Sequence, residues 1–313
     1  MHVLVTGADG FIGRVLVRRL LAQGLAGRAL ARLVAADLAL RDLPDDPRVQ
    51  GVEGSIADPG VLECALAEPV DAVFHLASLP GGAAERDPDL GRRVTLDATA
   101  QLLALLRGQG GAPRLVFAST VAVYGDPLPA VVDETTPARP AMSYGAHKLA
   151  AEVLVADAAR RGWVDACSLR LPGVVARPGD GAGLVSAFMS QLFWKLAAGE
   201  PIELPVSAQG TAWWISVGAC VDNLLRAASL DIAALDVRRV LQMPALHLSI
   251  GAVVDALASE YGEERRALVR HAPQEAVQRL FAAYPPLHTP LALALGLRHD
   301  GTAQSLVRRA VEA

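Results

Sequence analysis

The chain begins with an alternation of apolar runs and amphipathic segments that continues to about residue 171. Residues 2–6 form the first apolar run, a glycine-rich turn follows, and an amphipathic pattern then predicts a helix that ends near Gly24. More strands are predicted in the same way at residues 31–37, 49–53, 70–77, 114–120 and 165–171. Strands separated by helices indicate a parallel sheet with both faces covered.

The segments between these strands have helical spacing, and we expect helices from Asp58, over residues 90–106 and over residues 142–161. Beyond Pro172 the alternation weakens, although residues 186–198 are predicted to form a further helix. We therefore expect an α/β fold in which residues 1–171 form a doubly wound domain. Residues 172–313 should form a smaller part that mainly binds and caps a substrate and returns some segments to that domain.

Three glycines follow the first strand at intervals of three: Gly7, Gly10 and Gly13. Glycine lets the backbone turn sharply and approach a pyrophosphate, and the positive end of the following helix favours an anion at the same place. Phe11 and Ile12, at the start of that helix, are included in the expected cofactor site. On its own, the turn is also compatible with an ordinary connection between a strand and a helix.

Asp37 ends the second predicted strand, 24 residues after Gly13. A carboxylate at this spacing can accept hydrogen bonds from the adenosine ribose and repel a 2′-phosphate, which favours NAD over NADP. The alternative is a surface aspartate that opens a loop. Together with the glycine turn, Asp37 indicates a Rossmann-type domain that binds NAD.

The carboxyl ends of two further strands carry candidate binding residues. The fourth strand leads into Leu76, Ala77 and Ser78, at the edge where open α/β sheets bind ligands, and Ser78 is a candidate contact for both cofactor and substrate. Thr120 ends the fifth strand. By contrast, His75 lies inside an apolar run and is expected to be a hydrogen-bonded core residue.

Tyr144 and Lys148 are four residues apart on a predicted helix, so their side chains project from one face. A nearby ammonium group favours the phenolate form of tyrosine, so Tyr144 can act as a general base. Thr120 can hydrogen-bond the same substrate oxygen, and Lys148 can also hold the nicotinamide ribose. The alternative is that Tyr144 lies on the surface and Lys148 pairs with Glu152.

Charge and cysteine content limit the classes of partner. The net charge is −4 with basic residues scattered among acids, which argues against nucleic acid as a partner and against a polybasic membrane patch. No apolar run is long enough to span a membrane, and the first strand leaves no room for a signal peptide. Cys64, Cys167 and Cys220 fit neither a metal site nor a disulfide framework, so we expect small core residues in a cytoplasmic protein without a metal.

Four segments resemble the extended short-chain dehydrogenase/reductases, and the resemblance covers essentially the whole chain: residues 6–13, 74–77, 119–125 and 144–148. The resemblance implies that Gly7, Gly10 and Gly13 hold the pyrophosphate of NAD and Asp37 holds its ribose. Thr120, Tyr144 and Lys148 would be catalytic. It further implies a homodimer formed through the helices that begin near Leu90 and Met142. Additional cofactor contacts would come from Ser55, Ile56, Leu76, Ala77, Ser78 and Pro172.

The chain departs from that family pattern at several positions. Ser55 stands where an aspartate often meets the adenine, and Thr95 stands where an asparagine is common. The asparagine and the Arg-Asp pair that serve a sugar nucleotide are also absent from the segments at 170–174 and 212–215. Trp213 and Trp214, in the second of these segments, line a pocket or pack in a core.

In place of the sugar-nucleotide residues, Arg177 and Ser186 resemble the sugar-acid branch of the family. Arg177 can bind a carboxylate bidentately, or it is a surface residue of a Pro/Gly loop. This branch implies NAD-dependent oxidation of a secondary hydroxyl of a small sugar acid, with D-erythronate and its 2-oxo acid as the best match. Alternatives are oxidation of a uronate, 4-epimerisation of a nucleotide sugar with tightly bound NAD, and a non-catalytic NAD sensor.

Overall fold

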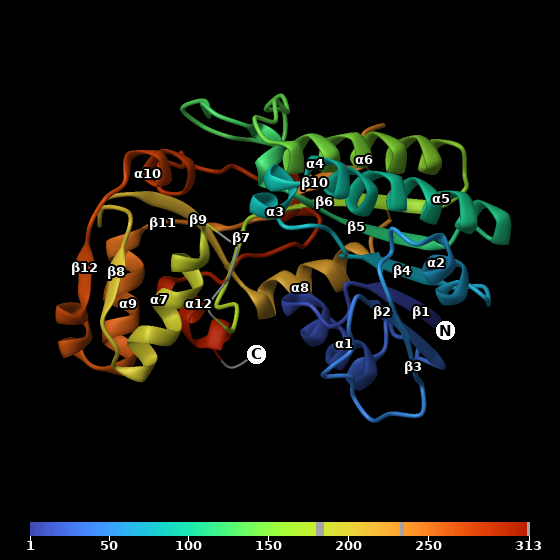
Figure 1. Cartoon of the computed structure of the whole chain (residues 1–313), viewed down its shortest axis with the longest axis horizontal. Coiled ribbons are helices and arrows are strands. Elements are labelled where there is room, and N and C mark those ends of the chain that lie inside the picture. Colours follow the sequence, from blue (N-terminus) through green and yellow to red (C-terminus); the bar gives the residue numbers. More distant parts are fainter. Residues whose placement is uncertain (180–184, 232–234, 312–313) are drawn as a thin grey trace. The chain divides into compact units, whose positions relative to one another are not determined.

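The computed structural model describes residues 1–179, 185–231 and 235–311 (Figure 1). The chain divides into two compact units, each built from several segments. The first unit comprises Met1–Gly125, Ala138–Arg170 and Val221–Leu241. The second unit comprises Asp126–Pro137, Leu171–Cys220 and Gln242–Ala313.

The first unit is built on a seven-stranded sheet with the order β10-β6-β5-β4-β1-β2-β3. All six strands predicted from the sequence lie in this sheet, and the pairs β1–β2, β1–β4, β2–β3 and β4–β5 are parallel. The fold class is therefore confirmed. The strands are β1 (His2–Thr6), β2 (Arg32–Asp37), β3 (Val49–Glu53), β4 (Ala72–His75), β5 (Arg114–Thr120), β6 (Asp165–Leu171) and β10 (Val240–Gln242).

Helices cover both faces of this sheet, as the apolar strands require. Leu4 of β1 belongs to a buried cluster with side chains of α2 (Pro59–Ala65), α5 (Ala98–Gln109) and α6 (Ser143–Arg160). Its neighbours Val3 and Val5 point to the opposite face because side chains alternate along a strand, and they are also fully buried. Figure 1 shows α1 (Phe11–Gln23) on the other side of the sheet from α5 and α6.

Two predicted elements differ from the structure. Strand β4 is shorter than expected because His75 is its last residue paired with both neighbouring strands, opposite Thr6 on β1 and Phe117 on β5. The single helix expected over residues 90–106 is instead interrupted by a π-helical turn at Arg93–Asp97, where Thr95 is buried and its carbonyl oxygen accepts a hydrogen bond from the Thr99 hydroxyl. The helical elements before it are α3 (Gly81–Arg86) and α4 (Pro88–Arg92).

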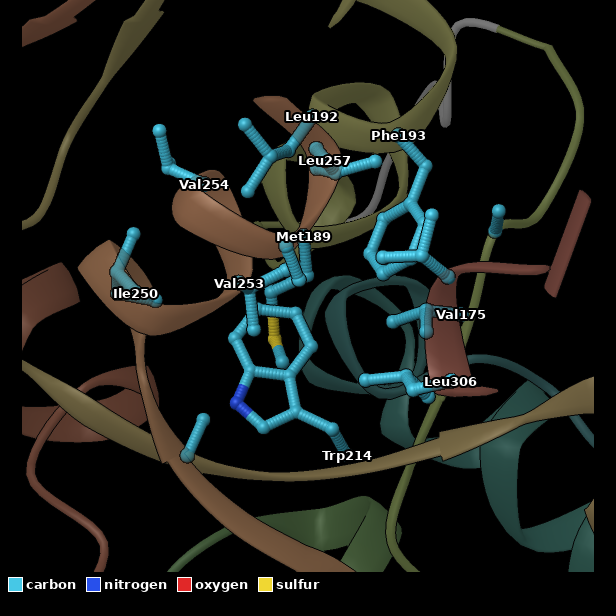
Figure 2. Close-up of a cluster of buried hydrophobic side chains, with 14 of the residues drawn as sticks. Val175, Met189, Leu192, Phe193, Trp214, Ile250, Val253, Val254, Leu257 and Leu306 are labelled. Carbon is cyan, nitrogen blue, oxygen red and sulfur yellow. The ribbon is translucent and has the colours of Figure 1, made fainter. Parts of the chain in front are cut away.

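The second unit has smaller sheets and an apolar core. Figure 2 shows side chains of α7 (Ala187–Ala198), α9 (Ile250–Tyr261) and α12 (Ala303–Val311) gathered around Trp214 of β9 (Thr211–Ser216). Strands β7 (Gly173–Val175) and β11 (Leu246–Ser249) flank β9, and β8 (Ile202–Leu204) pairs with β12 (Val269–His271). Further elements of the described residues include, in the first unit, the 3₁₀ turn at Val121–Tyr124 and most of α8 (Val217–Ala227). In the second unit they include the 3₁₀ turn at Glu263–Leu268 and the helices α10 (Glu275–Phe281) and α11 (Pro290–Ala294).

The cysteines do not all behave as predicted. Cys167 and Cys220 are buried, and burial raises the pKa of the Cys167 thiol to about 12. Cys64 is exposed on α2, so its prediction as a core residue is wrong. The core face of this short helix is supplied by Leu62 and Ala65, which leaves Cys64 on the solvent side.

Candidate active site

The turn between β1 and α1 has two positions, Gly7 and Gly13, at which only glycine fits. Gly7 has a φ of +74°, and a Cβ atom there would lie 2.8 Å from the backbone nitrogen of Ala77. A Cβ atom at Gly13 would overlap the carbonyl oxygen of Gly7. Helix α1 begins at Phe11, directly after Gly10, so its positive end faces the turn. This close backbone and helix terminus fit a pyrophosphate.

Asp37 lies at the carboxyl end of β2, beside the glycine turn. Its Oδ2 accepts the Asp9 N–H at 2.8 Å, and its Oδ1 accepts the Leu38 N–H at 2.7 Å. These two bonds fix the orientation of the carboxylate and leave further lone pairs on both oxygens. Asp37 is therefore already oriented to accept hydrogen bonds from a ribose.

His75 is a fully buried core residue, as predicted. The Thr99 hydroxyl donates to the Thr95 carbonyl oxygen, so it accepts from the Nε2–H of His75 at 2.9 Å. Nδ1 therefore accepts from the Thr6 hydroxyl at 2.7 Å, and the Thr6 oxygen accepts the Ala77 N–H at 3.3 Å. Burial lowers the pKa of His75 to about 3, and the Lys148 charge acts in the same direction.

This directed chain of hydrogen bonds links the end of β1 to the segment after β4. Leu76, Ala77 and Ser78 are half-buried there. Further along the same edge, the Ser55 hydroxyl accepts the Ala57 N–H at 3.2 Å, and the Ile56 side chain belongs to the core. The predicted cofactor residues from Gly7 to Ser78 thus lie at or after the carboxyl ends of β1, β2, β3 and β4, whereas Tyr144 and Lys148 lie on α6.

The three candidate catalytic residues come from β5 and the start of α6. Lys148 is buried, and its Nζ donates to the Ala118 carbonyl oxygen on β5 at 2.6 Å. Thr120 ends β5, where its hydroxyl accepts the Ala122 N–H at 3.2 Å. Tyr144 lies in the first turn of α6, and a Cβ atom at Gly81 would lie 3.6 Å from its Cδ1 atom. The first unit therefore brings β5, α6 and the segment after β4 together.

Helix α6 is held at its start by a residue from another element. The Ser143 N–H donates to the Glu85 carboxylate of α3, which satisfies a backbone donor at the helix N-terminus and places a negative charge there. A Cβ atom at Gly145 would lie 2.5 Å from the Ala122 carbonyl oxygen. These contacts fix the turn of α6 that carries Tyr144.

Lys148 has an unusual electrostatic environment. Burial lowers its pKa to about 7, although the Glu152 carboxylate on the next helical turn raises it. Its Nζ also lies 4.7 Å from the centroid of the Phe117 ring, a geometry that favours a cation. A lysine with such a pKa changes charge near neutral pH, which is typical of functional sites.

Glu152 pairs with Arg170 rather than with Lys148, the partner considered from the sequence. The Arg170 guanidinium donates to both carboxylate oxygens, at 2.9 and 2.7 Å, and the Ser119 hydroxyl donates at 2.5 Å. The glutamate and the arginine are both buried, and hydrogen bonding to Glu152 raises the pKa of Arg170 against the effect of burial. This network was not predicted from the sequence. The one signal for it was an arginine within an apolar strand, which indicates a buried charge but not its partner.

The remaining candidates lie in the second unit. Arg177 is exposed, and its carbonyl oxygen accepts the indole N–H of Trp194 at 2.9 Å. Ser186 is the residue before α7, and Pro172 is buried between β6 and β7. Part of the loop between Arg177 and Ser186 lies outside the described residues.

Trp213 and Trp214 are packing residues, one of the two readings left open by the sequence. Both are buried, and their indole N–H groups donate to the carbonyl oxygens of Pro285 and Leu248 at 2.7 and 3.1 Å. The Trp213 and Tyr284 rings lie 4.7 Å apart between centroids and are tilted by 59°, and burial raises the pKa of Tyr284 to about 12. Figure 2 shows Trp214 surrounded by apolar side chains.

Residues 3–231 match the family model described as the NAD dependent epimerase/dehydratase family. The chain belongs to that family. It is 37% identical to a D-erythronate dehydrogenase from Cupriavidus necator, over 100% of this chain and 98% of that protein. It is 30% identical to a D-erythronate dehydrogenase from Haemophilus influenzae, over 100% and 99% of the two chains.

A solved structure of a nucleoside-diphosphate-sugar epimerase from Agrobacterium tumefaciens has a similar fold. Its TM-score to this chain is 0.92 at 31% identity, and the match covers 100% of this chain and 94% of the other. Membership of the NAD dependent epimerase/dehydratase family identifies the protein as an enzyme and NAD as its cofactor. The glycine turn fits that cofactor, because it offers close backbone and a helix terminus to a pyrophosphate.

The described residues were also compared with the requirements of a metal site and of a membrane-spanning helix. In the described ranges, the His, Cys, Asp and Glu side chains form no group of three or more that is arranged to hold a metal ion. None of the helices in those ranges combines the length and the apolar character needed to cross a membrane.

Proposed function

We propose that the chain is an NAD-dependent dehydrogenase that oxidises a secondary hydroxyl of a small sugar acid. D-erythronate, converted to its 2-oxo acid, is the first substrate to test. The observation that carries the proposal is that β5 and α6 carry Thr120, Tyr144 and Lys148, with β4 as the only strand between β5 and the strand that leads into the glycine turn. The two full-length relatives named as D-erythronate dehydrogenases support the choice of substrate.

In this proposal the chain's own residues handle the hydroxyl proton. The phenolate of Tyr144 removes the proton from the substrate hydroxyl as the carbon–oxygen double bond forms. The Thr120 hydroxyl donates to the same oxygen and stabilises the charge that develops there. Lys148 favours the phenolate through its positive charge. NAD, when bound, accepts the hydride that leaves the same carbon.

We propose that NAD is held mainly by residues of the first unit. Gly7, Gly10 and Gly13 would hold the pyrophosphate and Asp37 the adenosine ribose, while Lys148 would also hold the nicotinamide ribose. The close backbone at the glycine turn and the fixed Asp37 carboxylate support these assignments. Weaker contacts are proposed for Phe11, Ile12, Ser55, Ile56, Leu76, Ala77, Ser78, Tyr144 and Pro172.

Substrate recognition is proposed for Ser78, Thr120, Tyr144, Arg177 and Ser186. Arg177 would bind the substrate carboxylate, because a guanidinium matches both carboxylate oxygens. The bond from Trp194 to its carbonyl oxygen supports this role by restraining the backbone at that position.

We also propose that the protein is a cytoplasmic homodimer formed through α5 and α6. Leu154 and Val153 of α6 are large apolar residues with 37% and 63% of their surface exposed. A hollow beside Leu154 is lined by Leu103 of α5 and by Trp163. Apolar surface of this kind is typical of an interface.

NADH formation with aldonates and uronates tests the proposed activity. We expect turnover with at least one sugar acid and its loss in the variant Y144F. The epimerase of similar fold favours nucleotide-sugar 4-epimerisation as a second candidate. Interconversion of UDP-hexoses without net NADH formation would support that candidate and overturn the dehydrogenase proposal. Retained function in Y144F would instead indicate an NAD sensor.

A further inference from the structure

The guanidinium of Arg14 on α1 bonds two acidic residues. Its Nε donates to the Asp9 carbonyl oxygen at 2.7 Å and to Asp9 Oδ1 at 3.1 Å, and its Nη2 donates to Asp9 Oδ2 at 3.1 Å. Its Nη1 donates to Asp42 Oδ2 at 2.9 Å. Each of the three nitrogens of this cation therefore has an oxygen partner.

Asp9 is the centre of this arrangement, although it lies inside the glycine turn. Its N–H donates to Asp37, and its carboxylate oxygens accept the Arg41 and Asp42 N–H groups at 3.1 and 3.2 Å. Only 8% of its side chain is exposed. Burial raises the pKa of Asp9, but the bonds from Arg41 and Arg14 outweigh burial and lower it overall. Asp9 is therefore negatively charged at neutral pH.

The same corner contains further negative charge. Asp37 is bonded to the Asp9 backbone, and Glu53 pairs in register with Asp37 on β3 and accepts the Leu40 N–H at 3.1 Å. A 2′-phosphate on the adenosine ribose would need cationic donors at this place, and an arginine is the residue best suited to supply them. Arg14 is an arginine at this corner, and each of its three guanidinium nitrogens is bonded to Asp9 or Asp42.

We propose that Asp9 is a second determinant of the preference for NAD over NADP, and that it acts by keeping the Arg14 guanidinium engaged. This inference rests on the proposed cofactor site, in which Asp37 holds the adenosine ribose. Removal of the Asp37 charge alone then leaves Arg14 bound to Asp9 and leaves the Asp9 charge in place. In this proposal, Arg14 can bind a 2′-phosphate through the nitrogens that Asp9 now holds only after its release from Asp9.

Binding of nucleotide fragments tests this without turnover. Isothermal titration with adenosine 2′,5′-bisphosphate and adenosine 5′-monophosphate gives the ratio of the two dissociation constants for each variant. We expect D37N to shift this ratio toward the bisphosphate, and D9N/D37N to shift it by a further factor of about ten, since a charge-assisted bond becomes available. Adding R14M to D9N/D37N should abolish that further shift.

Two results would overturn the inference. One is a ratio in D9N/D37N that equals the ratio in D37N, and the other is a gain in D9N/D37N that persists after R14M is added. The D37N variant tests the underlying cofactor site separately, because unchanged binding of both fragments to D37N would contradict that site itself.

Additional variants guard against misfolding and against general charge effects. D42N removes the charge of an exposed partner of Arg14, and it serves if D9N/D37N does not fold. In D42N/D37N the ratio of dissociation constants should shift toward the bisphosphate by less than is expected for D9N/D37N. D45N changes the net charge by the same amount at an exposed residue of the same loop. The ratio of dissociation constants in D45N/D37N should equal that in D37N. A shift in D45N/D37N equal to that in D9N/D37N would contradict the specific role of Asp9.

Discussion

The buried polar networks around His75 and Glu152 in the first unit differ from the apolar cluster around Trp214 in the second unit. In the first unit, buried polar side chains form directed networks, such as Thr6, His75 and Thr99 at one place and Ser119, Glu152 and Arg170 at another. In the second unit, the cluster around Trp214 is apolar, and its indole N–H donates to a backbone carbonyl oxygen. Buried networks fix the positions of groups more narrowly than apolar packing does, at the cost of desolvation. The second unit also has a buried network, in which the Ser216 hydroxyl donates to Asp300 at 2.6 Å. The contrast therefore lies between the networks around His75 and Glu152 and the apolar cluster around Trp214.

The first prediction concerns the apolar side of this comparison. W214A should lower the free energy of unfolding by about 3 to 5 kcal/mol, because a large buried side chain leaves a cavity. Urea unfolding measures the loss. NAD affinity should stay within about twofold, since NAD is proposed to be held mainly by the first unit. A destabilisation below about 1 kcal/mol would contradict a packing role for this indole.

The second prediction tests Tyr144 as the general base of the proposed reaction. Y144F should lower kcat by about a thousandfold, because the general base for the hydroxyl proton is removed. NAD binding, followed by quenching of protein fluorescence, should remain intact as the control. A variant with nearly full turnover would show that another group removes the proton.

The ion pair between Glu152 and Arg170 tests the stability of a buried network. E152Q should destabilise the protein by about 3 kcal/mol, because the buried Arg170 cation then loses the negative charge that balances it. The double variant E152Q/R170M removes both charges and should recover most of that loss. Equal unfolding free energies for the wild type and E152Q would show that the pair does not contribute to stability.

The effect of Lys148 is spread over a pH range, and per unit of pH it is the smallest of these effects. Its pKa is about 7 in the folded protein, against about 10.4 in an unfolded chain. Between these values the unfolded chain binds the proton more strongly, so the free energy of unfolding should rise with pH by up to about 1.4 kcal/mol per unit. The stability of the wild type relative to K148M should therefore increase from pH 7 to pH 10.

Urea unfolding of both proteins at several pH values measures this difference. Burial raises the pKa of Cys167 and of Tyr284 to about 12, which destabilises the folded state at high pH in both proteins. These contributions cancel in the difference. A difference that stays constant with pH would contradict a buried Lys148 whose pKa is lowered to about 7.

The sequence predicted the parts of the molecule that depend on local patterns. Hydrophobic periodicity predicted the six strands and the helix that carries Tyr144 and Lys148. The glycine turn was predicted from its residue type, because glycine is needed where the backbone turns sharply. The pairing of Glu152 could not be predicted, because spacing along α6 suggested Lys148, and only the packing of α6 against β6 brings Arg170 within reach. The π-helical turn at Thr95 and the exposure of Cys64 likewise depend on tertiary contacts.

The measurement that tests the account most directly uses D-erythronate carrying deuterium at C2. The purified protein is incubated with this substrate and NAD, and the reduced cofactor is analysed by mass spectrometry. The account predicts NADH that contains the deuterium, formed together with an equal amount of the 2-oxo acid. No NADH, or NADH without deuterium, would contradict the assignment of the chain as a dehydrogenase that oxidises C2 of this sugar acid.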